Sequence, residues 1–399
     1  MRKIILFSLF LILGLIASQA LPTLMGVEKF AAAKPTLDVM LYTCLAFIMI
    51  NVGREFELDK SRWRSYTADY FIAMATAAAP WLLICFYYMS LLPDDLFTNW
   101  DAWKENLLLS RFAAPTSAGI LFTMLANAGL KNSWIYQKTR VLAIFDDLDT
   151  ILLMIPLQIF MIGWKWQLGV VAVVVFFCLY LAWTKLDKFN MQQDWSSVLG
   201  YATILVFICQ GLYLFSKHLF GADAAIHIEV LLPAFVFGMI IKNRHIGGKR
   251  EERVAALVSL LFMLLVGMSM PLIDMNGTAP ITDSKSLIAT MPMMSGWEIA
   301  LHVVAVTILS NIGKLAPMLF YKDRSAIERL ALSIGMFTRG EVGAGVIFIA
   351  LGYNIGGPVL LISVLALVLN LILTVGFVSI VKWLALKVEG GPTAEIKEA

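Results

Sequence analysis

Charged side chains are scarce in this 399-residue chain: Asp, Glu, Lys and Arg make up only 15% of it, against about a quarter in an ordinary soluble domain. Hydrophobic residues account for 60%, and they gather in runs of about twenty, the length that a helix needs to cross a bilayer. The sequence therefore predicts an all-α polytopic membrane protein. The net charge of +3 gives no indication of a nucleic-acid partner.

Cysteine and histidine are also scarce, with four residues of each. The cysteines fall inside apolar runs and none of their spacings is that of metal ligands, so we expect small buried side chains at Cys44, Cys85, Cys178 and Cys209. The histidines show no ligand spacing either, and His245 is more typical of a solvated histidine than of a pH sensor. These spacings give no indication of a metal site, and we expect no cofactor and no enzyme activity.

Windowed hydropathy gives twelve membrane spans, at about residues 3–21, 36–53, 67–92, 106–128, 138–162, 165–185, 196–217, 226–243, 254–273, 297–321, 327–353 and 357–386. We expect the first to be a retained helix, although Ser18-Gln19-Ala20 could close a signal peptide. Residues 93–105 and 274–296 are predicted loops. The result is one transmembrane domain over residues 1–388, with core helices at about 67–162 and 297–386, and a short cytoplasmic tail over 389–399.

Lysine and arginine are distributed unevenly between the two ends of these spans. One side carries 22 basic residues and the other carries six, while the remaining three of the 31 lie inside spans. The positive-inside rule places the richer side, and both termini, in the cytoplasm. We therefore expect a multi-pass protein of a bacterial inner (plasma) membrane.

Seven ionisable residues lie inside predicted spans, where each is costly unless it meets a partner or a water-filled cavity. The acids are Asp146, Asp147 and Asp149 on the fifth span and Glu341 on the eleventh, and the bases are Arg111, Lys314 and Arg339. Three acids within four residues favour a functional site over ion pairs that only fix helix packing. Four acids against three bases also leave one carboxylate without a fixed countercharge, so we expect this core to require a cation or a proton.

Asp146 and Lys314 are predicted to meet at one depth. Asp146 lies about eight residues, or roughly 12 Å, inside the fifth span, and Lys314 lies at a similar depth from the same side in the tenth. Asp147 points about 100° away around the helix, so it can face a cavity while its neighbour is paired. Two adjacent carboxylates titrate as a coupled pair and supply the oxygen ligands that sodium and lithium prefer.

Two spans carry helix-breaking segments near their middles. Pro115, followed by Thr116 and Ser117, interrupts the fourth span, and the glycine-rich stretch 338–345 interrupts the eleventh. Interrupted spans at corresponding positions of two halves are typical of a transporter's binding site. We therefore expect spans three to five and ten to twelve to be inverted copies.

These segments resemble the monovalent cation/proton antiporter superfamily, in particular bacterial sodium/proton antiporters with a paired aspartate. The segment 329–342 ends in Thr-Arg-Gly-Glu-Val and is similar to the family's Gly-x-x-x-x-Pro-Arg-Gly-Glu-Val segment. Further similar segments are the ion-binding helix at 141–147, the crossed-helix motif at 116–119, the early Gly-x-Glu segment at 47–55 and the buried lysine at 313–314.

The resemblance implies an inverted-repeat fold with two crossed discontinuous helices and a homodimer whose core rocks against a dimerisation domain. It implies that Asp147 is the principal carboxylate for cation and proton, and that Asp146 pairs with Lys314 in one state. Thr116 and Ser117 would line one crossing, and Arg339 and Glu341 would brace the other. An Asp-Asp pair is associated with electrogenic exchange in this superfamily, which implies two protons per sodium ion.

Some residues depart from the family pattern. Thr338 stands where the family usually has proline, and Asp149 is an extra acid to which the pattern assigns no role, as it assigns none to Arg111. Two other transport functions stay open: a potassium/proton antiporter, and a sodium-coupled organic-anion transporter of related fold. An intramembrane aspartyl protease is disfavoured because it needs aspartates on separate helices and a Gly-x-Gly-Asp signature.

Overall fold

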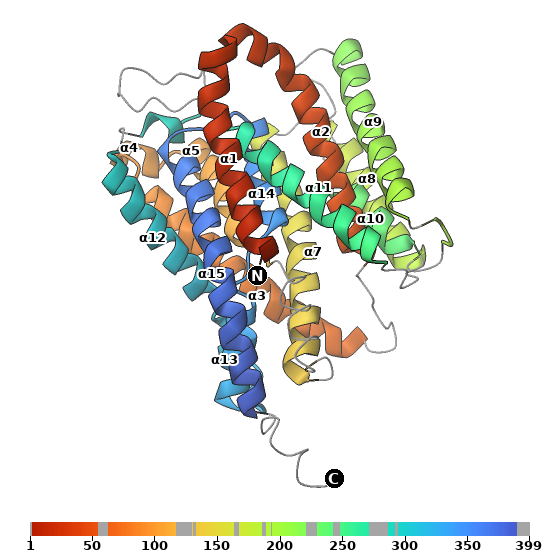
Figure 1. Cartoon of the computed structure of the whole chain (residues 1–399), viewed down its shortest axis with the longest axis vertical. Coiled ribbons are helices and arrows are strands. Elements are labelled where there is room, and N and C mark those ends of the chain that lie inside the picture. The colour runs from red at the N-terminus through yellow and green to blue at the C-terminus, as the bar shows by residue number, and fades with distance from the viewer. Residues whose placement is uncertain are drawn as a thin grey trace. The chain divides into compact units, whose positions relative to one another are not determined.

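The structure, a computed structural model, describes residues 2–54, 63–116, 130, 133–162, 167–185, 189–192, 194–220, 230–241, 248–270, 286–291 and 294–388. Figure 1 labels the helices in chain order. Within these ranges the chain is helical, and its extended pairing is limited to one isolated bridge between Phe189 and Ile241. The prediction of an all-α fold is confirmed.

The chain divides into two compact units, each assembled from separate stretches of sequence. One unit takes its described residues from 1–9, 61–157 and 271–399, and the other takes them from 10–60 and 158–270. The first unit, which we call the core unit, holds all seven of the charged residues that the sequence places inside spans.

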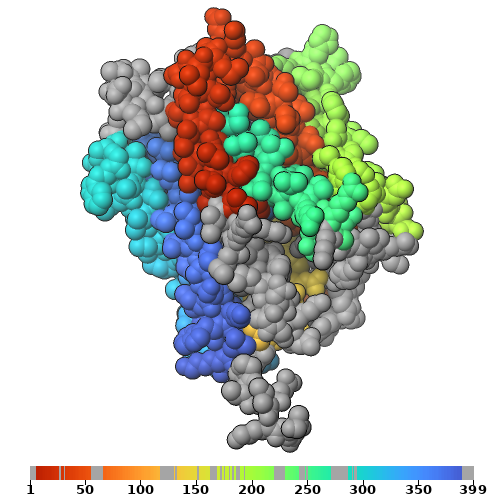
Figure 2. All heavy atoms as spheres, viewed as in Figure 1, coloured from red at the N-terminus to blue at the C-terminus, as the bar shows by residue number. Residues whose placement is uncertain are grey.

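The second unit contains most of α1 (Arg2–Met25) and the helices α2 (Val27–Arg54), α8 (Gln167–Lys185), α9 (Trp195–Phe220), α10 (Leu231–Ile240) and α11 (Lys249–Met268). Two glycine crossings fix its packing. A Cβ at Gly14 on α1 would overlap the Leu264 carbonyl on α11, and a Cβ at Gly53 on α2 would overlap the Phe235 carbonyl on α10. Figure 2 shows the atoms of α1 and α11 in direct contact. Glycine permits this approach because it has no side chain.

The core unit contains α3 (Trp63–Met89), α4 (Asp94–Phe97), α5 (Trp100–Ser110), the 3-10 turn η2 (Arg111–Ala113), most of α7 (Trp134–Ile162), η4 (Ile288–Thr290), α12 (Gly296–Gly313), η5 (Ala316–Leu319), α13 (Ala326–Gly335), α14 (Glu341–Gly352) and α15 (Pro358–Val388). Helix α12 packs against both α3 and α15, and α13 and α14 also pack against α15. Ser295 and Ser325 start α12 and α13 with capping boxes, in which the side chain accepts a hydrogen bond from the backbone N–H three residues on.

Helix boundaries agree with most predicted spans. Six described helices are long and apolar enough to cross a bilayer, namely Leu6–Met25, Glu28–Arg54, Tyr66–Met89, Trp195–Leu219, Gly296–Leu319 and Pro358–Val388. The total of twelve spans and their orientation stay predictions. The proposed tail over 389–399 lies outside the described residues.

The prediction of a loop over residues 93–105 is wrong. Helix α4 and the first half of α5 occupy this stretch, and Asn99 caps α5 by accepting a 2.8 Å hydrogen bond from the Asp101 N–H. Hydropathy windows respond to mean apolarity, so they miss short helices that are polar on one face. The same error set the start of the fourth span six residues too late.

Candidate functional site

Three aspartates lie within one turn of α7, inside the core unit. Asp146 is fully buried, Asp149 is 1% exposed and Asp147 is 8% exposed. The helical repeat places Asp146 and Asp149 on neighbouring positions of one face, while Asp147 points elsewhere. Asp147 is therefore the most accessible of the three carboxylates.

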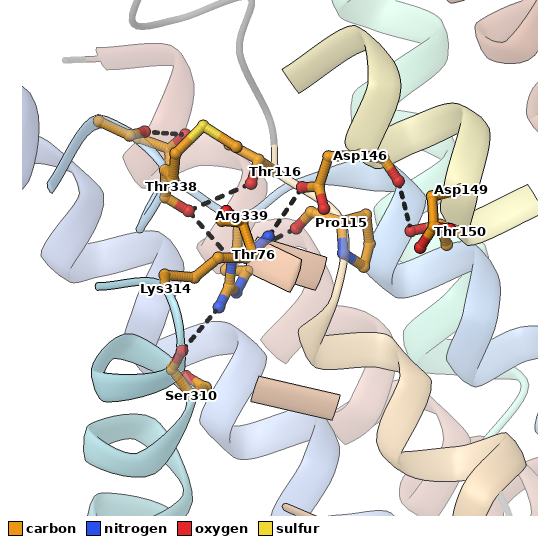
Figure 3. A network of polar contacts seen from close by, with 12 residues as sticks. Thr76, Pro115, Thr116, Asp146, Asp149, Thr150, Ser310, Lys314, Thr338 and Arg339 are labelled. Carbon is orange, nitrogen blue, oxygen red and sulfur yellow. Dashed lines mark hydrogen bonds and ion pairs between the residues drawn. The ribbon is translucent and has the colours of Figure 1, made fainter. Parts of the chain in front are cut away.

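Lys314 pairs with Asp146. It follows the C-terminus of α12, where Gly313 packs so closely on Pro80 of α3 that a Cβ would overlap that backbone. The Lys314 Nζ donates a 2.7 Å hydrogen bond to Asp146 Oδ2, and both side chains are fully buried (Figure 3). The contact expected from the depths of these two residues is present. The other carboxylate oxygen of Asp146, Oδ1, has no hydrogen-bond partner among the described residues.

Both predicted break points contain nonhelical backbone. Helix α5 ends at Ser110 and passes through η2 into nonhelical backbone at Pro115 and Thr116. Helix α13 ends at Gly335, and residues 336–340 separate it from α14. The two breaks touch, because the Thr116 Oγ1 donates a 3.1 Å hydrogen bond to the carbonyl of Met336 (Figure 3).

Arg339 bridges the two breaks through carbonyl oxygens. Its guanidinium donates to the carbonyls of Pro115 (3.4 Å), Met336 (3.3 Å) and Ser310 (3.4 Å), so it joins both interruptions to α12. Among the described residues it has no carboxylate partner at ion-pair distance. The three internal bases therefore form only two ion pairs there, which corrects the expected one-to-one compensation of charge.

Gly343 allows the two interrupted helices to approach. A Cβ at this position of α14 would come within 2.8 Å of the Phe112 carbonyl in η2. Gly343 and Gly345 were predicted to belong to the second break itself, but α14 is regular from Glu341 onward. The glycine therefore serves close packing at the crossing rather than unwinding of the backbone.

Asp149, to which the family pattern assigned no role, pairs with Arg111. The Arg111 Nη2 lies 2.8 Å from Asp149 Oδ2 and 2.9 Å from the Asp149 main-chain oxygen. The guanidinium also lies 4.5 Å from the centre of the Trp81 ring on α3. Sequence alone could not select this partner, because 38 residues separate the two charges and three acids competed for it.

Two further predicted site residues are Glu341 and Ser117. Glu341 is the first residue of α14 and lies directly after the second break, and its role as a brace stays a prediction. Ser117 lies outside the described residues. The assignment of Asp147, Asp146 and Thr116 to cation and proton binding, and of Ser117 with them, stays a prediction.

A buried amide on α15 supports the site and was missed in the sequence. Asn370 donates a 3.1 Å hydrogen bond to Ser310 Oγ and accepts another, also of 3.1 Å, from the Asn311 amide. Ser310 is the residue whose carbonyl Arg339 contacts. A single Asn within a long apolar helix was the available signal, since such a residue requires partners inside the bilayer.

A second polar cluster joins three elements of the core unit. Both carboxylate oxygens of Asp69 on α3 lie 2.7 Å from Lys138 Nζ on α7, and the Tyr321 hydroxyl donates a 2.8 Å hydrogen bond to the same carboxylate. Tyr321 follows η5 and has a positive φ of 49°. The cluster ties α3 and α7 to the segment that follows Lys314.

The fold and the site together define a class of protein. Nonhelical segments at the ends of two helices that meet beside buried carboxylates, in a chain of long apolar helices, are typical of a secondary transporter. The sequence matches the model of the sodium/hydrogen exchanger transmembrane family over residues 2–387. The chain belongs to this family, within the monovalent cation/proton antiporter superfamily, and is a cation/proton antiporter.

Solved structures support the same fold. The sodium/proton antiporter MjNhaP1 from Methanocaldococcus jannaschii aligns with a TM-score of 0.57 at 16% sequence identity, over 96% of this chain and 92% of that one. In all, 38 solved chains match significantly. Among curated proteins, no significant match to the sequence was found. At this identity the likeness shows the fold alone.

Proposed function

We propose that the protein exchanges protons for sodium or lithium across a bacterial inner membrane, electrogenically, and so contributes to pH homeostasis. The observation that carries this proposal is the fully buried Lys314–Asp146 pair beside the more accessible Asp147. A carboxylate that is paired in one state and released in another can take a cation only when its partner leaves. Protons and cation then compete for Asp146 and Asp147.

The crossing would supply the remaining cation ligands. Hard monovalent ions prefer oxygen, and the break at Pro115 and Thr116 offers carbonyl and hydroxyl oxygens that no regular helix would free. Arg339 supports this role because it holds the two breaks together without neutralising a described carboxylate.

Electrogenicity follows from the charge count of the pair. If two protons leave for each sodium ion that enters, the charge carried by the site changes by one unit between the two loaded forms. Alternating access would then expose Asp146 and Asp147 to each side in turn. We include in the proposal cytoplasmic termini, which the bias of basic residues supports, and a homodimer, which rests on family resemblance.

The test is proton flux in proteoliposomes after addition of sodium, lithium or potassium in turn. We expect sodium and lithium to drive flux in the wild type and Asp147→Asn to reduce it to the level of empty liposomes. Asp194→Asn, at an exposed aspartate before α9, is the matched control and should retain flux. Potassium-driven flux would instead assign a potassium/proton antiporter, and equal flux in wild type and Asp147→Asn would exclude the proposed site. A clamped membrane potential that fails to alter the rate would exclude electrogenic exchange.

A further inference from the structure

The third carboxylate of α7 raises a problem of selectivity. Asp149 lies three residues after Asp146, so the two side chains are neighbours on the helix, with Cβ atoms about 5–6 Å apart. If Asp149 were free as well, its oxygens would add to those of Asp146 and Asp147 and bring the site closer to the ligand set that proteins use for calcium, which binds several carboxylate and carbonyl oxygens. An exchanger of monovalent ions must prevent such a site from forming.

Arg111 occupies the position where it can do so. Its Nη2 contacts both the side chain and the main-chain oxygen of Asp149, so displacing it breaks two hydrogen bonds at once. Trp81 covers the guanidinium at 4.5 Å, and the Trp81 indole N–H is itself anchored by a 2.7 Å hydrogen bond to the Leu107 carbonyl. Both charged side chains are almost completely buried, at 0% for Arg111 and 2% for Asp149.

The chemistry of this pair differs from that of the Lys314 pair. A guanidinium keeps its proton under all conditions that a protein experiences, whereas an ammonium can lose its proton. Besides Arg111, the charged groups close enough to interact electrostatically with Asp149 are Asp146 on the same helix and Lys314 after α12. Tyr70 on α3 lies close enough to interact with both Asp149 and Arg111. Arg111 is therefore the permanent countercharge of Asp149. Figure 3 shows Asp149 on the far side of Asp146 from Lys314.

We propose that Arg111 is a specificity-determining residue: its ion pair with Asp149 removes the third carboxylate of α7 from the cation site and so keeps that site selective for monovalent over divalent ions. This inference rests on the proposed function. When Lys314 releases Asp146, two carboxylates face the incoming cation instead of three.

The test compares four proteins at one alkaline pH, where competition by protons is weakest: wild type, Arg111→Gln, Asp149→Asn and the double variant. Sodium-driven proton flux is measured with and without added calcium. Arg111→Gln removes the countercharge of Asp149 and leaves that carboxylate free, so the apparent KM for sodium should fall by on the order of tenfold, and calcium should inhibit competitively. Asp149→Asn leaves a free positive charge, so the apparent KM should rise by about as much.

The double variant restores neutrality and should return to the KM and the calcium insensitivity of the wild type. A purely structural role would instead lower the maximal rate of both single variants without moving KM in opposite directions. KM shifts of the same sign, or calcium insensitivity of Arg111→Gln, would overturn the inference.

The other variants distinguish a folding defect of Arg111→Gln, a failure of the proposed function and a failure of this inference. If Arg111→Gln does not fold, as judged by size-exclusion chromatography, the remaining pair decides: a raised KM in Asp149→Asn that the double variant reverses supports the inference, and equal KM values overturn it. If the wild type shows no cation-driven flux, the proposed function fails. If wild-type flux is present and Asp147→Asn abolishes it, a wrong outcome at Arg111 affects this inference alone.

Discussion

The two ion pairs of α7 differ in the contacts that hold them. Lys314 reaches Asp146 with a single 2.7 Å contact and leaves the second oxygen of that carboxylate without a hydrogen-bond partner among the described residues. Arg111 reaches Asp149 with two contacts and is covered by Trp81. A guanidinium that donates twice through Nη2 and stacks on Trp81 is harder to displace than a point charge on a flexible stem. In the function that we propose, the first pair opens during the cycle, and in the further inference the second pair remains closed.

Replacing Lys314 by arginine gives the Lys314–Asp146 pair the chemistry of the Arg111–Asp149 pair. Lys314→Arg keeps the charge but adds donors that can hold Asp146 more firmly, in a site that is already fully buried. We expect the exchange rate to fall by at least about tenfold, or roughly 1.4 kcal/mol of barrier. Proteoliposome flux measures the rate, and a thermal melt in detergent checks folding. An unchanged rate would show that release of Asp146 does not limit the cycle.

The packing of η2, which carries Arg111, can be disturbed without changing any charged residue. Gly343→Ala places a Cβ within 2.8 Å of the Phe112 carbonyl, next to Arg111 in η2. We expect a loss of about 1–3 kcal/mol in stability from overpacking. The melting temperature should fall, and the rate of exchange should fall with it.

Gly376→Ala is the control for this substitution, because a Cβ at that position on α15 meets nothing within 4 Å. It should leave the melting temperature unchanged or slightly raised, since alanine favours a helix. Equal destabilisation by the two substitutions would argue against a tight crossing at η2.

We expect the smallest effect when Arg111 is replaced by lysine, so that the pair with Asp149 resembles the Lys314–Asp146 pair. Arg111→Lys keeps the countercharge of Asp149 but loses the second contact and most of the packing on Trp81. The apparent KM for sodium should therefore stay within about twofold of the wild type, with a modest loss of stability of about 1 kcal/mol. A large change of KM, with Asp149 still paired by charge, would indicate that geometry rather than charge matters at this position.

Because burial of charge is expensive everywhere in a bilayer, the charged residues near the crossing could be selected from the sequence. Asp146, Asp147, Lys314 and Arg339 were selected by that cost alone, and Pro115 marked the first break through its missing N–H. The Asp146–Lys314 contact could be anticipated because two helices of known direction carry the residues to one depth.

Other contacts could not be predicted in this way. Arg339 was counted as a countercharge of the internal acids, but it donates to three carbonyls that lie at the two breaks and in the last turn of α12. Asp149 received no role, because choosing between three acids for one arginine requires knowing which face of α7 turns toward η2. Asn370 was missed because an amide carries no charge and stands out little within an apolar span.

The residues alone were enough to predict a membrane protein with a charged core and two helix-breaking segments. Hydropathy, helix breaking and the cost of buried charge act locally along the chain, so they can be evaluated residue by residue. Only the tertiary structure decided which charge neutralises which. Partners 168 residues apart, such as Asp146 and Lys314, meet through the packing of whole helices, and a rotation of one helix by a single residue would exchange one carboxylate for its neighbour.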